Sequence, residues 1–319
     1  MCSSDLITYI TTEITALQAT GDDALLITLA DPDRWELPPF SAGAHIDLLL
    51  GNGIKRSYSL CGDPANRYTY QLAVKRETES RGGSQWIHEQ FTPGMEVRIS
   101  LPRTTLQIQP HRQRHLLIAG GIGITPMLSM IYSLERAGLP YQLHYFYRGC
   151  PPLLAEVQQV AQQGEILLYP QGYRAGRKTE LQDIIPQPDD ELCLYCCGPQ
   201  RMMDAFNLCT TDWPGSQCQQ EHFSGLEVDD SMFPSYQLEL RQSGREITVR
   251  TGQSPLQALL EANVYVDHSC EGGICGACRV RWCEGNPVHR DKVLTEQQRQ
   301  QELIVCVAGC ESHRLVLDL

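Results

Sequence analysis

The segment Ser269-Cys-Glu-Gly-Gly-Ile-Cys-Gly-Ala-Cys278 decides the organisation of this chain, because it brings Cys270, Cys275 and Cys278 into one short loop. Cys306 follows further along the chain. This is the C-x4-C-x2-C…C spacing of plant-type [2Fe–2S] ligands. The glycines of the segment relax the backbone, so a tight loop can direct several thiolates into a small volume. The spacing therefore predicts a cluster that takes up one electron at a time, and with it an electron-transfer protein.

Three cysteines compete for the place of the fourth ligand, namely Cys283, Cys306 and Cys310. Side chains alternate along a strand, so a strand that begins at Cys278 would turn Cys283 to the opposite face. Cys306 lies in the apolar run Leu303-Ile-Val-Cys-Val307, which suits a buried position beside a cluster. We therefore predict that Cys306 is the fourth ligand.

Two other uses of these cysteines fit less well. Structural zinc sites usually carry two short pairs, whereas Cys306 and Cys310 are separated by three residues. The start, Met1-Cys-Ser-Ser-Asp5, has neither the basic nor the apolar segment of a secretory signal, which argues against a disulfide framework. The 14 cysteines then indicate a reducing compartment, and we expect a cytoplasmic protein.

Length and charge exclude several classes of protein. The 319 residues suffice for two or three domains. A net charge of −12 argues against nucleic acid as a partner. Residues 116–134 carry no charge and approach the length of a membrane span, but Gly120-Gly-Ile-Gly123 and Pro126 interrupt them. We expect no membrane association, and a monomer.

The first hundred residues predict an antiparallel β-barrel. Short strands are expected at 24–29, 45–50, 56–60, 68–75 and 96–100. Turn signals such as Gly51-Asn-Gly53 and Pro93-Gly94 separate them. Short strands joined in this way favour a closed barrel.

From residue 115 onward the pattern predicts a parallel α/β sheet. The apolar strand Leu116-Leu-Ile-Ala119 runs into the glycine segment 120–123, and a helix is expected at 127–137, ended by Gly138. Strands are predicted at 141–147, 165–169 and 192–197, with a helix at 199–209. Strands that alternate with helices are typical of nucleotide-binding domains.

The remaining residues complete a division into four parts. Residues 225–235 are polar and predict a linker. Beyond them we expect a hairpin of strands 236–240 and 246–250, then a helix that Ser254-Pro255 opens and that runs to Ala262. The predicted division is a barrel at 1–108, an α/β domain at 109–224, a linker at 225–235 and a cluster domain at 236–319.

The chemistry of the predicted cluster calls for a second cofactor. A nicotinamide gives up two electrons together as a hydride, whereas the cluster accepts one, so a flavin is expected between them. Arg56-Ser-Tyr-Ser59 and Arg81-Gly-Gly-Ser84 are candidates for a flavin site, the second as an anion cradle before a helix. The segment Gly120-Gly-Ile-Gly123 is a candidate phosphate loop.

These motifs, in this order, resemble one family. Arg56–Ser59, Arg81–Ser84, Gly120–Leu128, Cys196-Cys-Gly-Pro199 and the C-terminal cysteine loop together look like the phthalate dioxygenase reductase family, which includes vanillate demethylase reductases. The likeness covers essentially the whole chain. It implies an FMN-binding β-barrel, a parallel α/β domain for NADH and a C-terminal β-grasp [2Fe–2S] ferredoxin domain.

The resemblance also assigns residues to the cofactors. Those that would hold FMN, with Gly82 to Ser84 at its phosphate, are Arg56, Ser57, Tyr58, Ser59, Ala73, Val74, Lys75, Gly82, Gly83, Ser84 and Phe223. Those that would meet the nicotinamide nucleotide are Gly121, Gly123, Thr125, Arg148, Cys197, Gly198 and Pro199. Ser59, Thr125 and Cys197 are the predicted catalytic residues. The predicted metal ligands are Cys270, Cys275, Cys278 and Cys306.

Two positions depart from the family pattern. Gly149 follows Arg148 where relatives commonly carry an aspartate suited to a ribose 2′-hydroxyl, and Arg148 suits a 2′-phosphate. Ser224 follows Phe223 where an acid is expected. NADH remains the predicted donor.

The resemblance implies the reductase component of a two-component oxygenase. Electrons would pass from NADH through FMN and the cluster to a partner oxygenase, expected to be of the Rieske type. The alternatives are a reductase for another electron acceptor, and a non-enzymatic iron–sulfur redox sensor.

Overall fold

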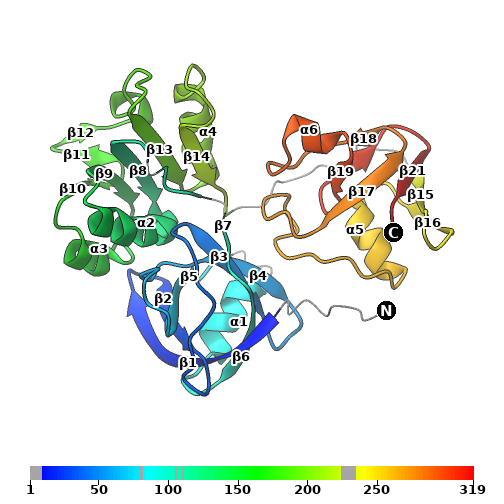
Figure 1. The fold of residues 1–319 in the computed structure, drawn as a ribbon, viewed down its shortest axis with the longest axis horizontal. Helices are drawn as coiled ribbons and strands as arrows, with labels where there is room; N and C mark the ends of the chain where they lie inside the picture. Colours follow the sequence, from blue (N-terminus) through cyan, green and yellow to red (C-terminus); the bar gives the residue numbers. More distant parts are fainter. Residues whose placement is uncertain (1–8, 79–81, 105, 110, 224–234) are drawn as a thin grey trace. The chain divides into compact units, whose positions relative to one another are not determined.

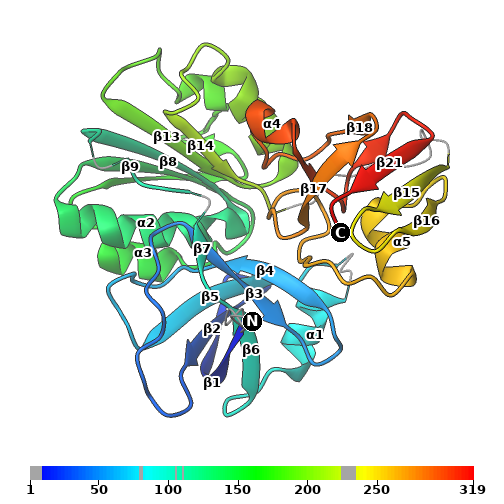
Figure 2. The same ribbon diagram turned by 45° about the vertical axis from the view of Figure 1, so that its right-hand side comes forward.

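The computed structural model describes residues 9–78, 82–104, 106–109, 111–223 and 235–319. The chain divides into two compact units, an N-terminal unit of residues 1–223 and a C-terminal unit of residues 224–319. Figure 1 shows their elements, and Figure 2 shows the same ribbon turned by 45°. The predicted linker lies almost entirely outside the described residues.

The first half of the N-terminal unit is an antiparallel barrel, as predicted. Its elements are β1 (Tyr9–Thr20), β2 (Ala24–Ala30), β3 (Ala44–Leu49), β4 (Lys55–Ser59), β5 (Thr69–Lys75), α1 (Gly83–Gln90), β6 (Glu96–Ser100) and β7 (Arg103–Thr104). The strand order is β4-β3-β6-β1-β2-β5. A bridge between Leu60 and Leu72 joins the two end strands and closes the ring. Closure removes the free edges that an open sheet would expose.

Strand β1 is the longest element of the barrel, and the sequence patterning did not predict it. It reads YITTEITALQAT, where threonines stand among the apolar residues and blur the period of two. Ile14 and Thr20 are nonetheless buried, and Ile14 joins the barrel core with Ile27 and Ile46. Pairing with β2 and β6 therefore overrides the weak local signal.

The second half of the N-terminal unit is built on a parallel sheet. Its elements are β8 (Arg114–Gly120), η1 (Gly121–Gly123), α2 (Ile124–Ala137), β9 (Tyr141–Tyr147), α3 (Leu154–Val160), β10 (Glu165–Pro170), β11 (Tyr173–Arg174), β12 (Arg177–Lys178), η2 (Leu181–Asp183), β13 (Leu192–Cys197), α4 (Gln200–Cys209) and β14 (Cys218–Glu221). The sheet order is β10-β9-β8-β13-β14, with all pairs parallel. The chain leaves β8 toward β9 but leaves β13 toward β14, so the connections diverge between β8 and β13. In such sheets ligands bind outside the carboxyl ends of the strands at that point.

Alternate side chains of the central strands face two helical layers. Leu117 packs with helices α2 and α3, whereas Ile118 packs with α4. Helix α2 ends at Gly138, in the left-handed region at φ 65°, as predicted. It begins at Ile124 rather than residue 127, because Pro126 falls in the first turn, where its missing N–H has no partner to lose.

The C-terminal unit is a mixed sheet crossed by one helix. Its elements are β15 (Tyr236–Leu240), β16 (Arg245–Val249), α5 (Pro255–Glu261), β17 (Arg279–Glu284), β18 (Pro287–Val288), α6 (Glu296–Arg299), β19 (Glu302–Ile304), β20 (Gly309–Cys310) and β21 (Arg314–Leu317). The order is β16-β15-β21-β17-β19, with β15 and β21 parallel. Ser254 caps α5 by accepting from the Gln257 amide, so the helix starts where the sequence predicts. Leu256 and Leu259 of α5 pack on the sheet, the arrangement of a β-grasp.

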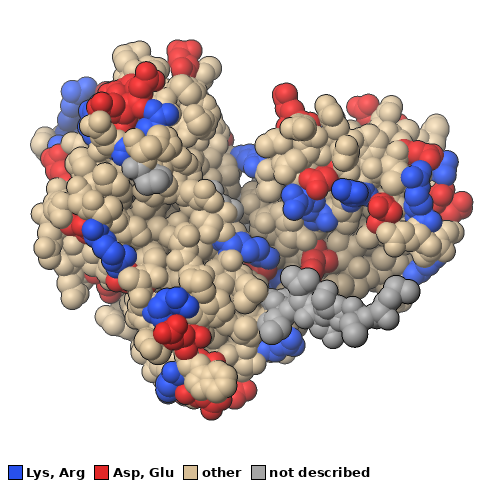
Figure 3. All heavy atoms as spheres, in the orientation of Figure 1, with Lys and Arg blue, Asp and Glu red and all other residues tan. Residues whose placement is uncertain are grey.

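Charge is spread thinly over one face of the molecule. On the face drawn in Figure 3, lysine and arginine alternate with aspartate and glutamate, and broad areas carry neither. Within the residues that the structure describes, no helix is both long and apolar enough to cross a bilayer.

Candidate functional site

The cysteine loop of the C-terminal unit depends on glycine at Gly273 and Gly276. Both adopt the left-handed region, with φ of 73° and 72°. A Cβ on Gly273 would lie 2.7 Å from Cγ2 of Val307, a contact that real side chains do not make. Val307 follows the predicted ligand Cys306, so this close approach packs the loop against the segment that carries the fourth thiol. A side chain at Gly273 would force the two segments apart.

The four predicted ligands share one volume. The thiols of Cys275 and Cys306 hydrogen-bond to the sulfur of Cys270, which lowers the pKa of Cys270. The Cys306 thiol also lowers the pKa of Cys278. Cys270, Cys278 and Cys306 are buried, and Cys275 is half-buried. Cys306 stays the predicted fourth ligand.

The two competing cysteines have other surroundings. Cys310 is buried, but its Sγ donates to the carbonyl of Ser312 at 3.3 Å. Cys283 lies on β17 and is half-buried. Neither sulfur is among the groups that shift the pKa of the four clustered thiols.

Backbone amides point at the clustered sulfurs. The Gly272 amide donates to Cys270 Sγ at 3.4 Å, and the Ile274 amide acts on the same sulfur. The Ala277 amide acts on Cys275. Hydrogen bonds of this kind favour the thiolate form and tune the potential of an iron–sulfur cluster. Four converging thiols with such donors fit a [2Fe–2S] cluster.

The described residues hold no group of three side chains arranged around a single metal ion.

Asp291 braces the cysteine loop, a role that the sequence patterning missed. Its Oδ2 accepts from the amides of Val293 at 3.0 Å and Leu294 at 2.7 Å, and Arg299 Nη2 lies 3.7 Å away. The next amide, of Lys292, donates to the carbonyl of Gly273. The buried carboxylate therefore orders segment 291–294, and the Lys292 amide links that segment to the loop that presents the thiols.

In the N-terminal unit, the predicted flavin strand β4 is anchored by a buried carboxylate. Ser57 Oγ donates to Asp47 Oδ1 at 2.7 Å, and Arg103 Nη2 donates to Asp47 Oδ2 at 2.6 Å. Asp47 is 1% exposed. Burial raises the pKa of the Tyr58 phenol, so Tyr58 is neutral. Asp47 was missed because one acid in an apolar strand gives no sign of its cross-strand partners.

Glu221 joins two predicted catalytic residues in one buried region. Ser59 Oγ donates to Glu221 Oε2 at 3.0 Å, and His45 Nδ1 lies 4.0 Å from Glu221 Oε1. Burial, with a further contribution from Glu221, raises the pKa of the Cys197 thiol well above its usual value. Cys197 is therefore a neutral thiol at physiological pH. Glu221 ends β14, a strand that the sequence did not predict, and so it was missed.

The segment before α1 suits an anionic phosphate. Gly82 is the N-cap at φ 85°, and the first turn of the helix carries no acid. A Cβ on Gly83 would lie 2.7 Å from Cγ of Arg56, so the Arg56 side chain lies across this glycine. A helix N-terminus beside a guanidinium favours an anion, because the helix dipole and the cation both attract negative charge. Ser84 Oγ accepts from the Glu77 amide at 3.2 Å, and Arg81 lies outside the described residues.

Glycines at the carboxyl ends of β8 and β13 bring the two backbones together. A Cβ on Gly123 would lie 2.2 Å from the Cys197 carbonyl oxygen, and one on Gly120 would lie 2.6 Å from Cδ of Pro199. A Cβ on Gly198 would lie 3.1 Å from Cα of Gly120. These glycines lie where the connections between the strands diverge, which is the position expected for a bound nucleotide.

Thr125 stabilises the turn that carries Gly121 and Gly123. Its Oγ1 donates to the carbonyl of Ile122 at 3.0 Å, and the residue is 1% exposed. Gly121 lies in the same turn at φ 55°. Thr125 therefore orders the loop through its backbone contact instead of presenting a free hydroxyl.

The other predicted contacts differ in how far they are exposed. Val74 is fully buried in the barrel core, so only its backbone remains for a cofactor, and its carbonyl already lies 2.8 Å from His88 Nε2. Ala73 packs with the core of the parallel sheet. Lys75 pairs with Asp23 and with Glu77.

Two predicted contacts are exposed side chains. Phe223 is 38% exposed. Arg148 lies exposed just beyond the carboxyl end of β9.

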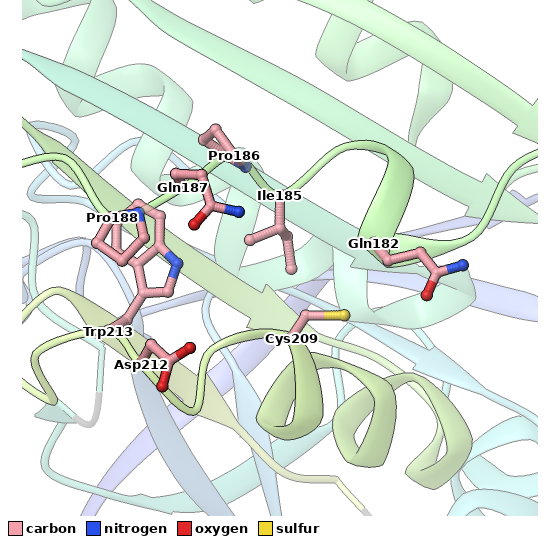
Figure 4. Close-up of a pocket in the computed structure, with 8 residues that line it drawn as sticks. All are labelled: Gln182, Ile185, Pro186, Gln187, Pro188, Cys209, Asp212 and Trp213. Atoms are coloured by element: carbon pink, nitrogen blue, oxygen red, sulfur yellow. The ribbon is translucent and has the colours of Figure 1, made fainter.

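A shallow hollow of about 160 Å³ lies away from these groups (Figure 4). Its lining residues are Gln182, Ile185, Pro186, Gln187, Pro188, Cys209, Asp212 and Trp213. They precede β13, end α4 at Cys209 or follow α4, at the amino edge of the parallel sheet. The hollow is therefore no part of the site at the carboxyl ends.

Known proteins share both the sequence and the architecture. A family described as a 2Fe-2S iron-sulfur cluster binding domain matches residues 238–311. Phenoxybenzoate dioxygenase subunit beta of Ectopseudomonas oleovorans is 37% identical over 96% of each chain. Phthalate dioxygenase reductase of Burkholderia cepacia is 32% identical over 98% of each chain.

Solved structures agree with these relatives. A structure of phthalate dioxygenase reductase, described as modular for electron transfer from pyridine nucleotides to [2Fe–2S], covers 98% of each chain with a TM-score of 0.75. A type IV self-sufficient cytochrome P450 monooxygenase is 37% identical with a TM-score of 0.84, and its match spans 41% of that longer chain. The chain described here therefore belongs to the phthalate dioxygenase reductase family, the reductase components of oxygenase systems.

Proposed function

We propose that this protein oxidises NADH and passes the electrons singly, through FMN and a [2Fe–2S] cluster, to a partner oxygenase in the cytoplasm. The observation that carries the proposal is the presence, in one chain, of a buried junction suited to hydride transfer and a set of four clustered thiols. Membership of the family supports the same pathway.

The electrons balance over the whole reaction. One NADH yields NAD⁺, a proton and two electrons, and each acceptor molecule takes one electron. The bound flavin supplies the change from two-electron to one-electron transfer, and the cluster supplies the one-electron exit. The protein contributes binding, orientation and electrostatics.

The chain's own residues shape the junction for hydride transfer. Gly120, Gly123 and Gly198 let the ends of β8 and β13 pack closely together, and nothing lies within 4 Å of a Cβ placed on Gly121, so a planar ring can approach the backbone there. The neutral Cys197 thiol presents no charge beside the developing nicotinamide cation, whereas the Glu221 carboxylate nearby favours positive charge. Ser59 holds that carboxylate in place by its hydrogen bond. The step needs no side-chain acid or base.

Several finer assignments belong to the proposal. The flavin is FMN, because the Gly82–Ser84 cradle suits a terminal phosphate. The functional parts are 1–108, 109–224, the linker 225–235 and 236–319. The acceptor is an oxygenase of the Rieske type, and the reductase acts as a monomer.

Anaerobic titration tests the proposal directly. NADH added to the purified protein should bleach the flavin and the cluster in sequence, with one FMN and two irons per chain. Flavin released by acid that chromatographs as FAD would overturn the FMN assignment. A protein that binds the cluster but is not reduced by NADH would be a redox sensor instead.

A second acceptor class has support from one observation. In the self-sufficient cytochrome P450 monooxygenase, the region that matches this protein makes up 41% of a longer chain. A P450 haem protein is therefore the alternative acceptor. Stopped-flow reduction of a Rieske oxygenase and of a P450, each mixed with NADH-reduced protein, distinguishes the two.

A further inference from the structure

The turn between β1 and β2 is fastened to the loop that follows β9. The amide of Cys150 donates to Asp22 Oδ2 at 2.8 Å, and the amide of Leu153 donates to Thr20 Oγ1 at 2.7 Å. A Cβ on Gly21 would lie 2.9 Å from the carbonyl oxygen of Cys150. A turn of the barrel is thus held against the parallel sheet domain by hydrogen bonds from backbone amides to its side chains.

The carboxylate of Asp22 occupies the space where a side chain of residue 149 would begin. A Cβ on Gly149 would lie 1.9 Å from Asp22 Oδ2, and Gly149 has φ 60°. Both the conformation and the neighbour therefore demand glycine here. Asp22 and Arg148 are both exposed, so the carboxylate and the guanidinium are accessible to a ligand.

In a nucleotide-binding sheet, the carboxyl end of the second strand lies near the adenosine ribose of the nucleotide. Strand β9 follows β8 and α2, so it is the second strand of the nucleotide fold. An acid at its carboxyl end accepts a hydrogen bond from the adenosine ribose 2′-hydroxyl, whereas an arginine there accommodates a 2′-phosphate. Arg148 alone would favour NADPH, and Gly149 has no carboxylate to oppose it.

We propose that Asp22, a residue of the barrel, supplies the missing carboxylate and makes the enzyme select NADH over NADPH. The inference rests on the proposed function and names a specificity residue for it. The Cys150 amide holds Oδ2, and Oδ1 has no partner among the described residues, so it can accept from a ribose hydroxyl. The same charge repels a 2′-phosphate, which carries nearly two negative charges.

The size of the effect follows from the charges. One carboxylate a few ångströms from a nearly doubly charged phosphate, in a solvent-exposed site, is worth roughly a tenfold difference in binding. A purely structural Asp22 would hold the loop equally for both nucleotides and leave their ratio unchanged.

Asp22→Asn separates these roles, because asparagine keeps the acceptor for the Cys150 amide and removes only the charge. Asp33→Asn is the matched control, an exposed acid beyond the other end of β2 with the same loss of charge. The readouts are kcat/KM for NADH and NADPH with ferricyanide, and the calorimetric Kd of adenosine 2′,5′-bisphosphate against that of AMP.

For Asp22→Asn we expect the NADPH to NADH ratio of kcat/KM to rise about tenfold, with a similar tightening of the bisphosphate. Asp33→Asn should change neither. Arg148→Ala in the Asp22→Asn background should remove the gain. An unchanged ratio in Asp22→Asn, with NADH still oxidised by the wild type, would overturn the role of Asp22 and leave the proposed function standing. A wild type that oxidises neither nucleotide would overturn the proposed function, and the bisphosphate titration would still decide the role of Asp22.

Discussion

Replacing Gly273 by alanine should loosen the cluster more than an equally strained substitution elsewhere in the same unit. The left-handed backbone at φ 73° costs an alanine roughly 1–2 kcal/mol. The added Cβ also meets Val307 Cγ2 at 2.7 Å, and overpacking of a buried side chain costs typically about 1–3 kcal/mol. Together these give about 2–5 kcal/mol against the loop that presents the thiols.

Gly244→Ala is the matched control. Gly244 has φ 66° in the turn between β15 and β16, and nothing lies within 4 Å of a Cβ placed there. It should therefore cost only the backbone strain, about 1–2 kcal/mol. The difference, about 1–3 kcal/mol, corresponds to a change of roughly 5-fold to 150-fold in the population of the displaced loop.

The assay uses the full chain with both cofactors. The rate at which visible cluster absorbance disappears in dilute urea with an iron chelator reports the loop, and flavin absorbance serves as the internal reference. Gly273→Ala should lose its cluster about tenfold faster than Gly244→Ala. Equal rates for the two variants would refute the argument that contact with Val307 positions the loop.

Three further outcomes are expected. Cys306→Ser should abolish the cluster spectrum and leave flavin reduction by NADH intact, whereas Cys310→Ser should keep both; the reverse pattern would mean that Cys310 is the ligand. Truncation after Glu227 should leave a flavoprotein that reduces ferricyanide but not the native oxygenase, and an undiminished rate to the oxygenase would show that electrons leave from the flavin. Burial lowers the pKa of His115 to about 4, below its unfolded value near 6.5. The unfolded state therefore binds the proton first, so thermal stability should fall as pH drops from about 6.5 toward 4, and His115→Asn should flatten that fall.

Much of the fold follows from local sequence signals. The cysteine spacing, the glycine segment after Ala119 and the turn at Ser243-Gly244 all reflect backbone requirements that few other sequences satisfy. Strand β13 has the predicted bounds, because a continuous apolar run between turn signals is typical of a buried parallel strand. Strand β9 also has the predicted bounds, although Gln142 and His144 interrupt its apolar residues.

The missed elements lack such local signals. Strand β14 reads CQQE, and its two glutamines give no strand pattern; pairing with β13 creates the strand. Helix α3 follows Leu153, a non-glycine residue at φ 56°, which no capping rule would select as a start.

The missed site residues share one physical reason. Asp47, Glu221 and Asp291 are single acids whose partners the sequence does not reveal. Ser59, the partner of Glu221, is 162 residues away, and Asp291 binds the backbone amides of Val293 and Leu294. Burial of an acid costs free energy unless partners compensate it, so the role of such an acid can be recognised only when its partners are known. Asp22 belongs to the same class, since a turn acid in a barrel gives no hint of the nucleotide loop it touches.

The barrel and the parallel sheet share a hydrophobic core. Leu26, Ala42 and Ala73 of the barrel are packed in one cluster with Leu117 and Met127 of the sheet domain. Neither half can therefore be exchanged between relatives without leaving apolar side chains against a foreign surface. Functional hybrids between relatives should therefore have their crossover near residue 224. The C-terminal ferredoxin unit can then be exchanged, whereas residues 1–223 are exchanged only as a whole. New acceptors would then be acquired in this family by replacing the last third of the gene, while the chemistry of NADH oxidation stays fixed.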